Sequence, residues 1–171
     1  REMIVSQLSS IKAPLGKFAV YGEQDLVSPE RKELVNSIYH DSEIEVLENS
    51  MVSIANQDRS PIQLAGLSID PDVQAACGSF NPEQFNLLLS HYPDNLLDPA
   101  LAVLPVSYAI AGNAHGTQIT WPIKGGYRDY PGSTQLNRAH DRDLTFPFWL
   151  SSGTGCINFH ARLNSPVEIV Y

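Results

Sequence analysis

The stretch NLLLSHYPD, residues 86–94, places an apolar run directly before a histidine and two other polar side chains. A continuous apolar run without alternation is typical of a central strand that is covered on both faces, so residues 86–90 are predicted to form one. His91 follows where that strand ends. In open α/β sheets, ligands bind at the carboxyl ends of strands because the adjacent loops diverge there. The stretch therefore predicts a central strand with a functional side chain, His91, at its end.

The segments on either side alternate short apolar runs with amphipathic stretches, which predicts an α/β or α+β fold. Ser28 followed by Pro29 predicts the start of a helix that ends near Tyr39, because serine caps helix N-termini and proline suits the first turn. The other expected elements are helices over residues 3–11, from 70 onward and over 94–103; strands over 17–21, 44–47, 51–55, 61–69, 108–111, 146–151 and 167–171; and a long loop over 123–143.

The bulk composition restricts the class of protein. The 171 residues suit one domain, residues 1–171, and 43% hydrophobic with 18% charged residues is an ordinary globular composition. A net charge of −8, with no cluster of lysine and arginine, argues against nucleic-acid binding. No stretch approaches the length of a membrane span, so we expect no membrane contact from this segment.

Two further strand ends carry side chains of the kind that binds metal ions. Glu23 and Gln24 follow the strand predicted over residues 17–21, and Asn113 and His115 follow the strand predicted over 108–111. Each feature alone has a simpler explanation, since a histidine after a strand is more often a hydrogen-bonding residue and a carboxylate after glycine is usually part of a turn. Three such ends together predict one convergent site.

In order, these ends read GEQD, SHYPD and AGNAHGTQI, and they resemble the third, fourth and fifth motifs of the calcineurin-like metallophosphoesterases, G-N-H-D/E, H-x-P-D and G-H-T-H-G-G-Q. Residues 8–22 and the closing residues 151–169 are similar to the family's flanking segments in its bacterial-type small members. The resemblance implies the C-terminal part of a four-layer αββα sandwich with two mixed sheets. The chain is then a single phosphoesterase domain that lacks its N-terminal part.

The chemistry that the resemblance implies is phosphoester hydrolysis by two divalent ions of the Mn, Fe, Zn or Mg class. His91 and His115 match metal-ligating histidines, and Glu23 stands where the family has a ligating Asn. Asn113 replaces the first histidine of the fifth motif, and Gln24 replaces the histidine that acts catalytically near the leaving group. The family's D-x-H and G-D-x-x-D motifs do not precede Gly22. We therefore expect a metal site of reduced occupancy, or one that is lost, and weak or absent hydrolysis.

Three interpretations remain open. The chain is a phosphoesterase whose missing ligands lie upstream of Arg1, a non-catalytic binding or regulatory relative, or a subunit completed by a separate N-terminal chain. Half of a sandwich leaves an edge strand unpaired, so we expect a homodimer or an association with the missing N-terminal part. A phosphoester is the expected small-molecule partner of an active form. A cytoplasmic location is expected, with an upstream targeting segment as the alternative.

Overall fold

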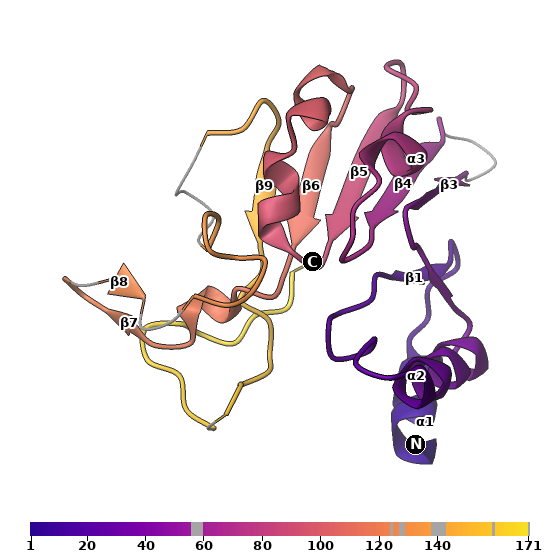
Figure 1. The fold of residues 1–171 in the computed structure, drawn as a ribbon. Coiled ribbons are helices and arrows are strands. Elements are labelled where there is room, and N and C mark those ends of the chain that lie inside the picture. The colour runs from indigo at the N-terminus through magenta and orange to yellow at the C-terminus, as the bar shows by residue number, and fades with distance from the viewer. Residues whose placement is uncertain (56–59, 124, 127–128, 138–142, 159, 171) are drawn as a thin grey trace.

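The computed structural model describes residues 1–55, 60–123, 125–126, 129–137, 143–158 and 160–170. Helices and strands alternate along the chain and form a mixed five-stranded sheet, a parallel two-stranded sheet and a short hairpin (Figure 1). This arrangement confirms the predicted α+β class with two sheets. Within the described residues, no helix is long and apolar enough to cross a membrane.

The central sheet has the strand order β3-β4-β5-β6-β9. β3 runs antiparallel to β4, and the pairs β4–β5, β5–β6 and β6–β9 are parallel. The strand predicted over residues 86–90 is β5 and occupies the middle of the sheet, as expected. The five strands are β3 (Ser50–Ile54), β4 (Ile62–Leu67), β5 (Phe85–Ser90), β6 (Tyr108–Ala111) and β9 (Phe148–Leu150).

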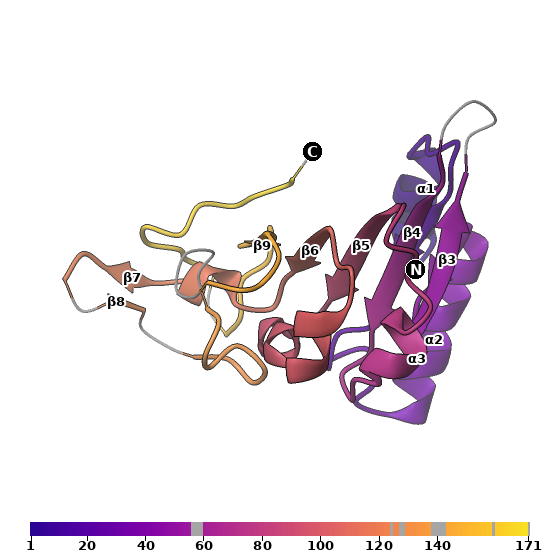
Figure 2. The ribbon, with the colours of Figure 1, turned by 90° about the horizontal axis from the view of Figure 1, so that it is seen from above.

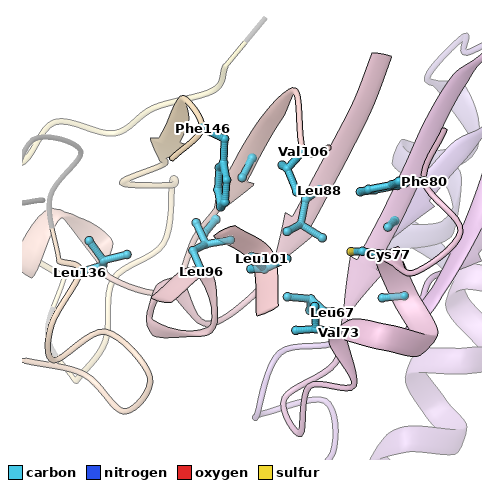
Figure 3. Packing of buried hydrophobic residues seen from close by; sticks show 14 of the residues in the cluster. Leu67, Val73, Cys77, Phe80, Leu88, Leu96, Leu101, Val106, Leu136 and Phe146 are labelled. Carbon is cyan, nitrogen blue, oxygen red and sulfur yellow. The ribbon is translucent and has the colours of Figure 1, made fainter. Parts of the chain in front are cut away.

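The hydrophobic core lies on one face of this sheet. α3 (Val73–Cys77) and two 3-10 helices, η1 (Pro93–Leu97) and η2 (Pro99–Val103), cover that face (Figures 1 and 2). Side chains alternate between the faces of a strand, so Leu88 and its register partners Ala65 and Ala109 all point into the core. Figure 3 shows Leu88 between Val106 and Leu101, with Cys77 and Phe80 contributed from α3 and the segment after it.

The opposite face of the sheet is also apolar, and among the described residues it is covered at β4, where Leu47 and Val20 lie against Gly66, but less completely at β5 and β6. The register aligns Leu87 with Tyr108 and Leu89 with Ile110, and none of the four belongs to the core cluster. All four stay partly exposed although they lie on central strands. Three other side chains on this face are more exposed: Phe85 (50%) and Ile62 (39%) at the starts of β5 and β4, and Trp149 (39%) on the edge strand β9.

The N-terminal residues form a separate layer beside β3 and β4. It consists of α1 (Glu2–Ser10), β1 (Lys17–Ala19), α2 (Pro29–Asp41) and β2 (Ile44–Val46), and β1 pairs in parallel with β2. The predicted start of α2 is confirmed, because the Ser28 hydroxyl accepts a hydrogen bond of 3.2 Å from the Arg31 amide. Val20 and Leu47, which follow the two strands, pack against Gly66 of β4.

Two predicted elements were wrong. The helix predicted over residues 94–103 is split into η1 and η2 at Pro99, because proline has no amide proton and holds Asp98 before it in an extended conformation. The strand predicted over 167–171 is absent from residues 167–170, and residue 171 lies outside the described part. Glu168 fixes that segment instead: its amide donates to the Gly153 carbonyl at 3.0 Å.

A short hairpin leads into the predicted long loop, residues 123–143, and its second strand lies within that loop. β7 (Thr120–Trp121) pairs antiparallel with β8 (Gly125–Gly126), and a single bridge joins Tyr130 to Ser133. Residues 124, 127–128 and 138–142 of this loop lie outside the described residues. The loop returns to the sheet through Leu136, which is fully buried at the end of the core (Figure 3).

Candidate metal centre

The site lies where β5 and β6 end side by side. The two strands are parallel, and Ser90 at the end of β5 is the register partner of Ala111 at the end of β6. His91 therefore leaves the sheet at the same edge as Asn113. The polar residues after β1 also reach this edge, because Gly22 lies against the His91 ring. The predicted convergence of three strand ends is thus the arrangement that the fold provides.

Glu23 and His91 meet directly. Oε2 of Glu23 lies 2.6 Å from Nε2 of His91, and both side chains are more than two-thirds buried, with 28% and 23% exposed. The Tyr92 ring packs beside the His91 ring with centroids 5.2 Å apart. Gly22 permits this packing, since a Cβ there would lie 3.0 Å from Cε1 of His91. The sequence identified both residues but not their contact.

The charge of Glu23 is set by opposing effects. Burial raises the pKa of its carboxyl group, but the hydrogen bond and the charge of His91, with hydrogen bonds from its own amide and from Gln24, leave that pKa below its ordinary value of 4.5. A carboxyl group whose pKa is lowered in the folded state stabilises the fold at pH values above its ordinary pKa. This contribution is lost as the pH falls through the lowered pKa of the folded state. Glu23 is therefore an anion at neutral pH.

Gln24 is exposed and lies beside the pair, where its side chain hydrogen-bonds with Glu23. A carboxamide has no proton that it can transfer at neutral pH, so Gln24 can orient the carboxylate but cannot protonate a leaving group.

Asn113 is buried, with 9% exposed, and its backbone has φ of 61°, a left-handed conformation that asparagine tolerates better than most residues. Its amide nitrogen donates to the carbonyl oxygen of Pro131. That bond leaves Oδ1 as the atom that can accept a hydrogen bond or bind a cation. Asn113 therefore links the end of β6 to the loop that carries Tyr130.

His115 lies between that loop and the C-terminal segment. Its Nδ1 is 3.4 Å from the Gly155 carbonyl oxygen, and its ring is 5.4 Å from the Tyr130 ring, centroid to centroid. Burial lowers the pKa of His115 most strongly; the positive charges of Arg162 and His91 lower it further, while Gly155 and Glu23 act against them. His115 is therefore neutral at neutral pH, the form in which imidazole binds metals. His91 and Glu23 act on the pKa of His115 through their charges, and no hydrogen bond between His115 and either side chain is found among the described residues.

These donors fit a divalent cation in kind. One carboxylate, two imidazoles and one amide oxygen are ligands that ions of the Mn, Fe and Zn class accept. Their placement does not complete such a site, because the described residues contain no group of three His, Cys, Asp or Glu side chains gathered to hold one ion, although Glu23, His91 and His115 are residues of that kind. The four side chains would thus supply part of a metal site.

Two residues near the site, Asp94 and Arg162, hold its surrounding segments in place, a role that was not predicted from the sequence. Asp94 accepts four hydrogen bonds of 2.8–3.0 Å from residues 134–136, so it anchors the loop behind the site. Burial raises the pKa of Asp94, but those hydrogen bonds hold it below 3.8. Arg162 reaches the carbonyl groups of Ser152 and Gly155. The sequence placed Asp94 at the start of a predicted helix, and no sequence pattern indicates an arginine that binds distant carbonyl groups.

Comparison with known proteins gives one informative similarity. No protein-family model matches the chain, and no solved structure matches it. The chain is 25% identical over 177 aligned residues to an uncharacterized metallophosphoesterase, YkoQ, of Bacillus subtilis strain 168. The match covers 98% of this chain but 63% of that relative, so the chain spans less than two-thirds of the relative's length. Over nearly all of its residues, then, the chain is similar to a metallophosphoesterase.

Proposed function

We propose that this chain forms part of a metal-dependent phosphoesterase site that hydrolyses phosphomonoesters or phosphodiesters weakly, with divalent ions of the Mn, Fe, Zn or Mg class. The observation that carries the proposal is the 2.6 Å contact between Glu23 and His91 at the shared edge of the sheet. A buried carboxylate and imidazole that converge there, with neutral His115 in the same environment, are a partial ligand set for such an ion. The similarity to a metallophosphoesterase supports the same chemistry.

Bound divalent ions would supply a hydroxide nucleophile and charge stabilisation for the phosphate group. The residues of this chain would hold and orient those ions: Glu23 as an anion, His91 and His115 through imidazole nitrogen, and Asn113 through Oδ1. Gln24 would orient Glu23 without moving a proton. Loss of general-acid catalysis lowers a rate by roughly 10²–10⁴-fold, which is why weak turnover is proposed.

The proposal includes a further polypeptide segment that supplies strands and the remaining metal ligands. Parallel sheets are normally covered on both faces, and two strands alone are marginally stable, yet β1 and β2 form a two-stranded sheet beside an apolar face that stays partly exposed at β5 and β6. β1, α2 and β2 form a βαβ unit. α1 precedes β1 and packs beside α2, which is the position of a helix that connects a further parallel strand to β1. The relative has more than a third of its length outside the match, enough for such strands.

The test is hydrolysis of p-nitrophenyl phosphate and bis-p-nitrophenyl phosphate by the natural full-length protein with Mn²⁺. The expected result is slow turnover that a chelator abolishes and that His91→Gln lowers at least about tenfold. His40→Gln is the matched control, because the His40 side chain is 90% exposed and lies on α2. Turnover at the ordinary enzymatic 1–10³ s⁻¹ would contradict the weak-activity proposal. Mn²⁺ binding without any turnover would favour a non-catalytic binding protein.

A further inference from the structure

Arg162 is a half-buried cation whose side chain contacts backbone carbonyl groups from separate segments. Nη2 donates to the Ser152 carbonyl oxygen at 2.7 Å, and Nε donates to that of Gly155 at 3.1 Å. Nη1 lies 3.2 Å from the Pro166 carbonyl oxygen and 3.4 Å from that of His115. The ion pairs found among the described residues do not include Arg162. Its charge is balanced by carbonyl dipoles and by no carboxylate in that part of the chain.

These contacts converge on His115. The Gly155 carbonyl oxygen that Arg162 holds is the oxygen 3.4 Å from Nδ1 of His115. The hydroxyl of Ser165, which is 4% exposed, donates to the His115 backbone carbonyl at 2.7 Å, and the Ser165 carbonyl oxygen lies 3.4 Å from Nη1 of Arg162. Gly116 allows this approach, because a Cβ there would lie 2.4 Å from the Ser165 hydroxyl oxygen. Both the main chain and the ring of His115 are thus tied to Arg162.

The guanidinium group suits this task better than an ammonium group. It carries five N–H donors in a rigid plane and stays charged at every accessible pH, so it can bond several carbonyl groups in different directions. Lysine offers three donors on one nitrogen and cannot span the distance between Ser152 and His115 in the same way. Carbonyl groups that bond an imidazole N–H fix the ring orientation and tautomer of a histidine.

We propose that Arg162 is a positioning residue for His115: it holds the Gly155 carbonyl oxygen where that oxygen accepts the Nδ1–H, which leaves Nε2 of His115 as the ligating atom at the candidate metal centre. This inference rests on the proposed function for the role of Nε2. The effect of Arg162 on the orientation and tautomer of the His115 ring in the metal-free protein does not depend on that function. The two parts can therefore be tested separately.

The first measurement is the nitrogen chemical shifts of the His115 imidazole, by NMR of the metal-free full-length protein. We expect the tautomer with the proton on Nδ1 in the wild type and a mixture of tautomers in Arg162→Ala. Arg31→Ala is the matched control, since Arg31 is exposed on α2, and it should keep the wild-type shifts. Identical His115 shifts in Arg162→Ala and wild type would overturn the positioning role.

The second measurement is the Mn²⁺ affinity by electron paramagnetic resonance. Arg162→Ala should bind Mn²⁺ about tenfold more weakly, and millimolar guanidinium ion should restore most of the loss, a rescue that a purely structural role would not give. A loss that guanidinium does not restore in a folded variant would overturn the proposal. If Arg162→Ala does not fold, Arg162→Lys keeps the positive charge but cannot bond the same carbonyl groups, so it should shift the same imidazole signals; unchanged signals would overturn the proposal. A wild type that binds no Mn²⁺ would refute the proposed function, and the imidazole shifts would still decide the role of Arg162.

Discussion

Gly22 offers the sharpest perturbation of the candidate site, because it lies against the His91 ring. In Gly22→Ala the new Cβ would lie 3.0 Å from Cε1, 3.3 Å from Nε2 and 3.4 Å from Nδ1 of His91. Ordinary contact begins near 3.4 Å, so the ring has to retreat by roughly 0.4 Å. That movement stretches the 2.6 Å contact with Glu23 toward about 3.0 Å.

The expected consequence is a weaker partial metal site without loss of the fold. Displaced supporting groups typically lower metal affinity 10–100-fold, and a small ring shift lies at the lower end, so we predict about tenfold weaker Mn²⁺ binding, about 1.4 kcal/mol. The assay is a Mn²⁺ titration followed by electron paramagnetic resonance, with thermal unfolding measured in parallel.

Gly112→Ala is the matched control. Gly112 also ends a strand at this edge, but a Cβ there would meet nothing within 4 Å. We predict Mn²⁺ affinity within about twofold of the wild type for this variant. Equal affinities in Gly22→Ala and wild type, or equal losses in the two variants, would refute the steric reasoning.

Three further predictions concern catalysis, pH dependence and the open sheet face. Gln24→His should raise the rate of p-nitrophenyl phosphate hydrolysis by roughly 10²-fold, because imidazole can donate the proton that glutamine cannot; an unchanged rate would remove Gln24 as the cause of weak turnover. Asp94→Asn should destabilise the fold by about 2 kcal/mol in urea unfolding at pH 7, since it weakens four hydrogen bonds to a carboxylate. The lowered pKa of Asp94 means that its contribution is present above pH 3.8 and is lost as the pH falls below it, so the difference between variant and wild type should shrink in acid; a constant difference would contradict this. Residues 1–171 alone should bind a hydrophobic dye through the face around Phe85 and Trp149, whereas the full-length protein should not; a dye-free 171-residue dimer in light scattering would show that a second copy covers the face.

The fold was predictable where local patterns act alone. The apolar run before His91 predicted a central strand, and Ser28-Pro29 predicted the start of a helix, because each pattern has one favourable local structure. Prediction failed over residues 94–103, where Pro99 divides an apparently helical apolar pattern. It also failed at the closing segment, where the hydrogen bonds of Glu168 replace a strand ladder.

The candidate site was predicted from the sequence as a set of residues, which stays a prediction, and the structure adds the contact between two of them. Strand ends that carry polar groups identified Glu23, His91 and His115, because parallel strands bring their ends to one edge. The 2.6 Å contact of Glu23 with His91 depends on the close approach of Gly22, which no sequence pattern states. The role of Arg162 was not predicted, because its partners are backbone carbonyl groups. Every residue has such a group, so the sequence does not show which ones an arginine binds.

In the proposed metal centre, Glu23, His91, Asn113 and His115 supply part of the ligand set for divalent ions. Mn²⁺ titration of the full-length protein by electron paramagnetic resonance tests it most directly, with Glu23→Gln and His91→Gln as variants and His40→Gln as the control. We predict that the wild type and the control bind Mn²⁺ and that each site variant binds it at least tenfold more weakly. A wild type that binds no Mn²⁺, or site variants that bind it as tightly as the control does, would refute the proposed metal centre.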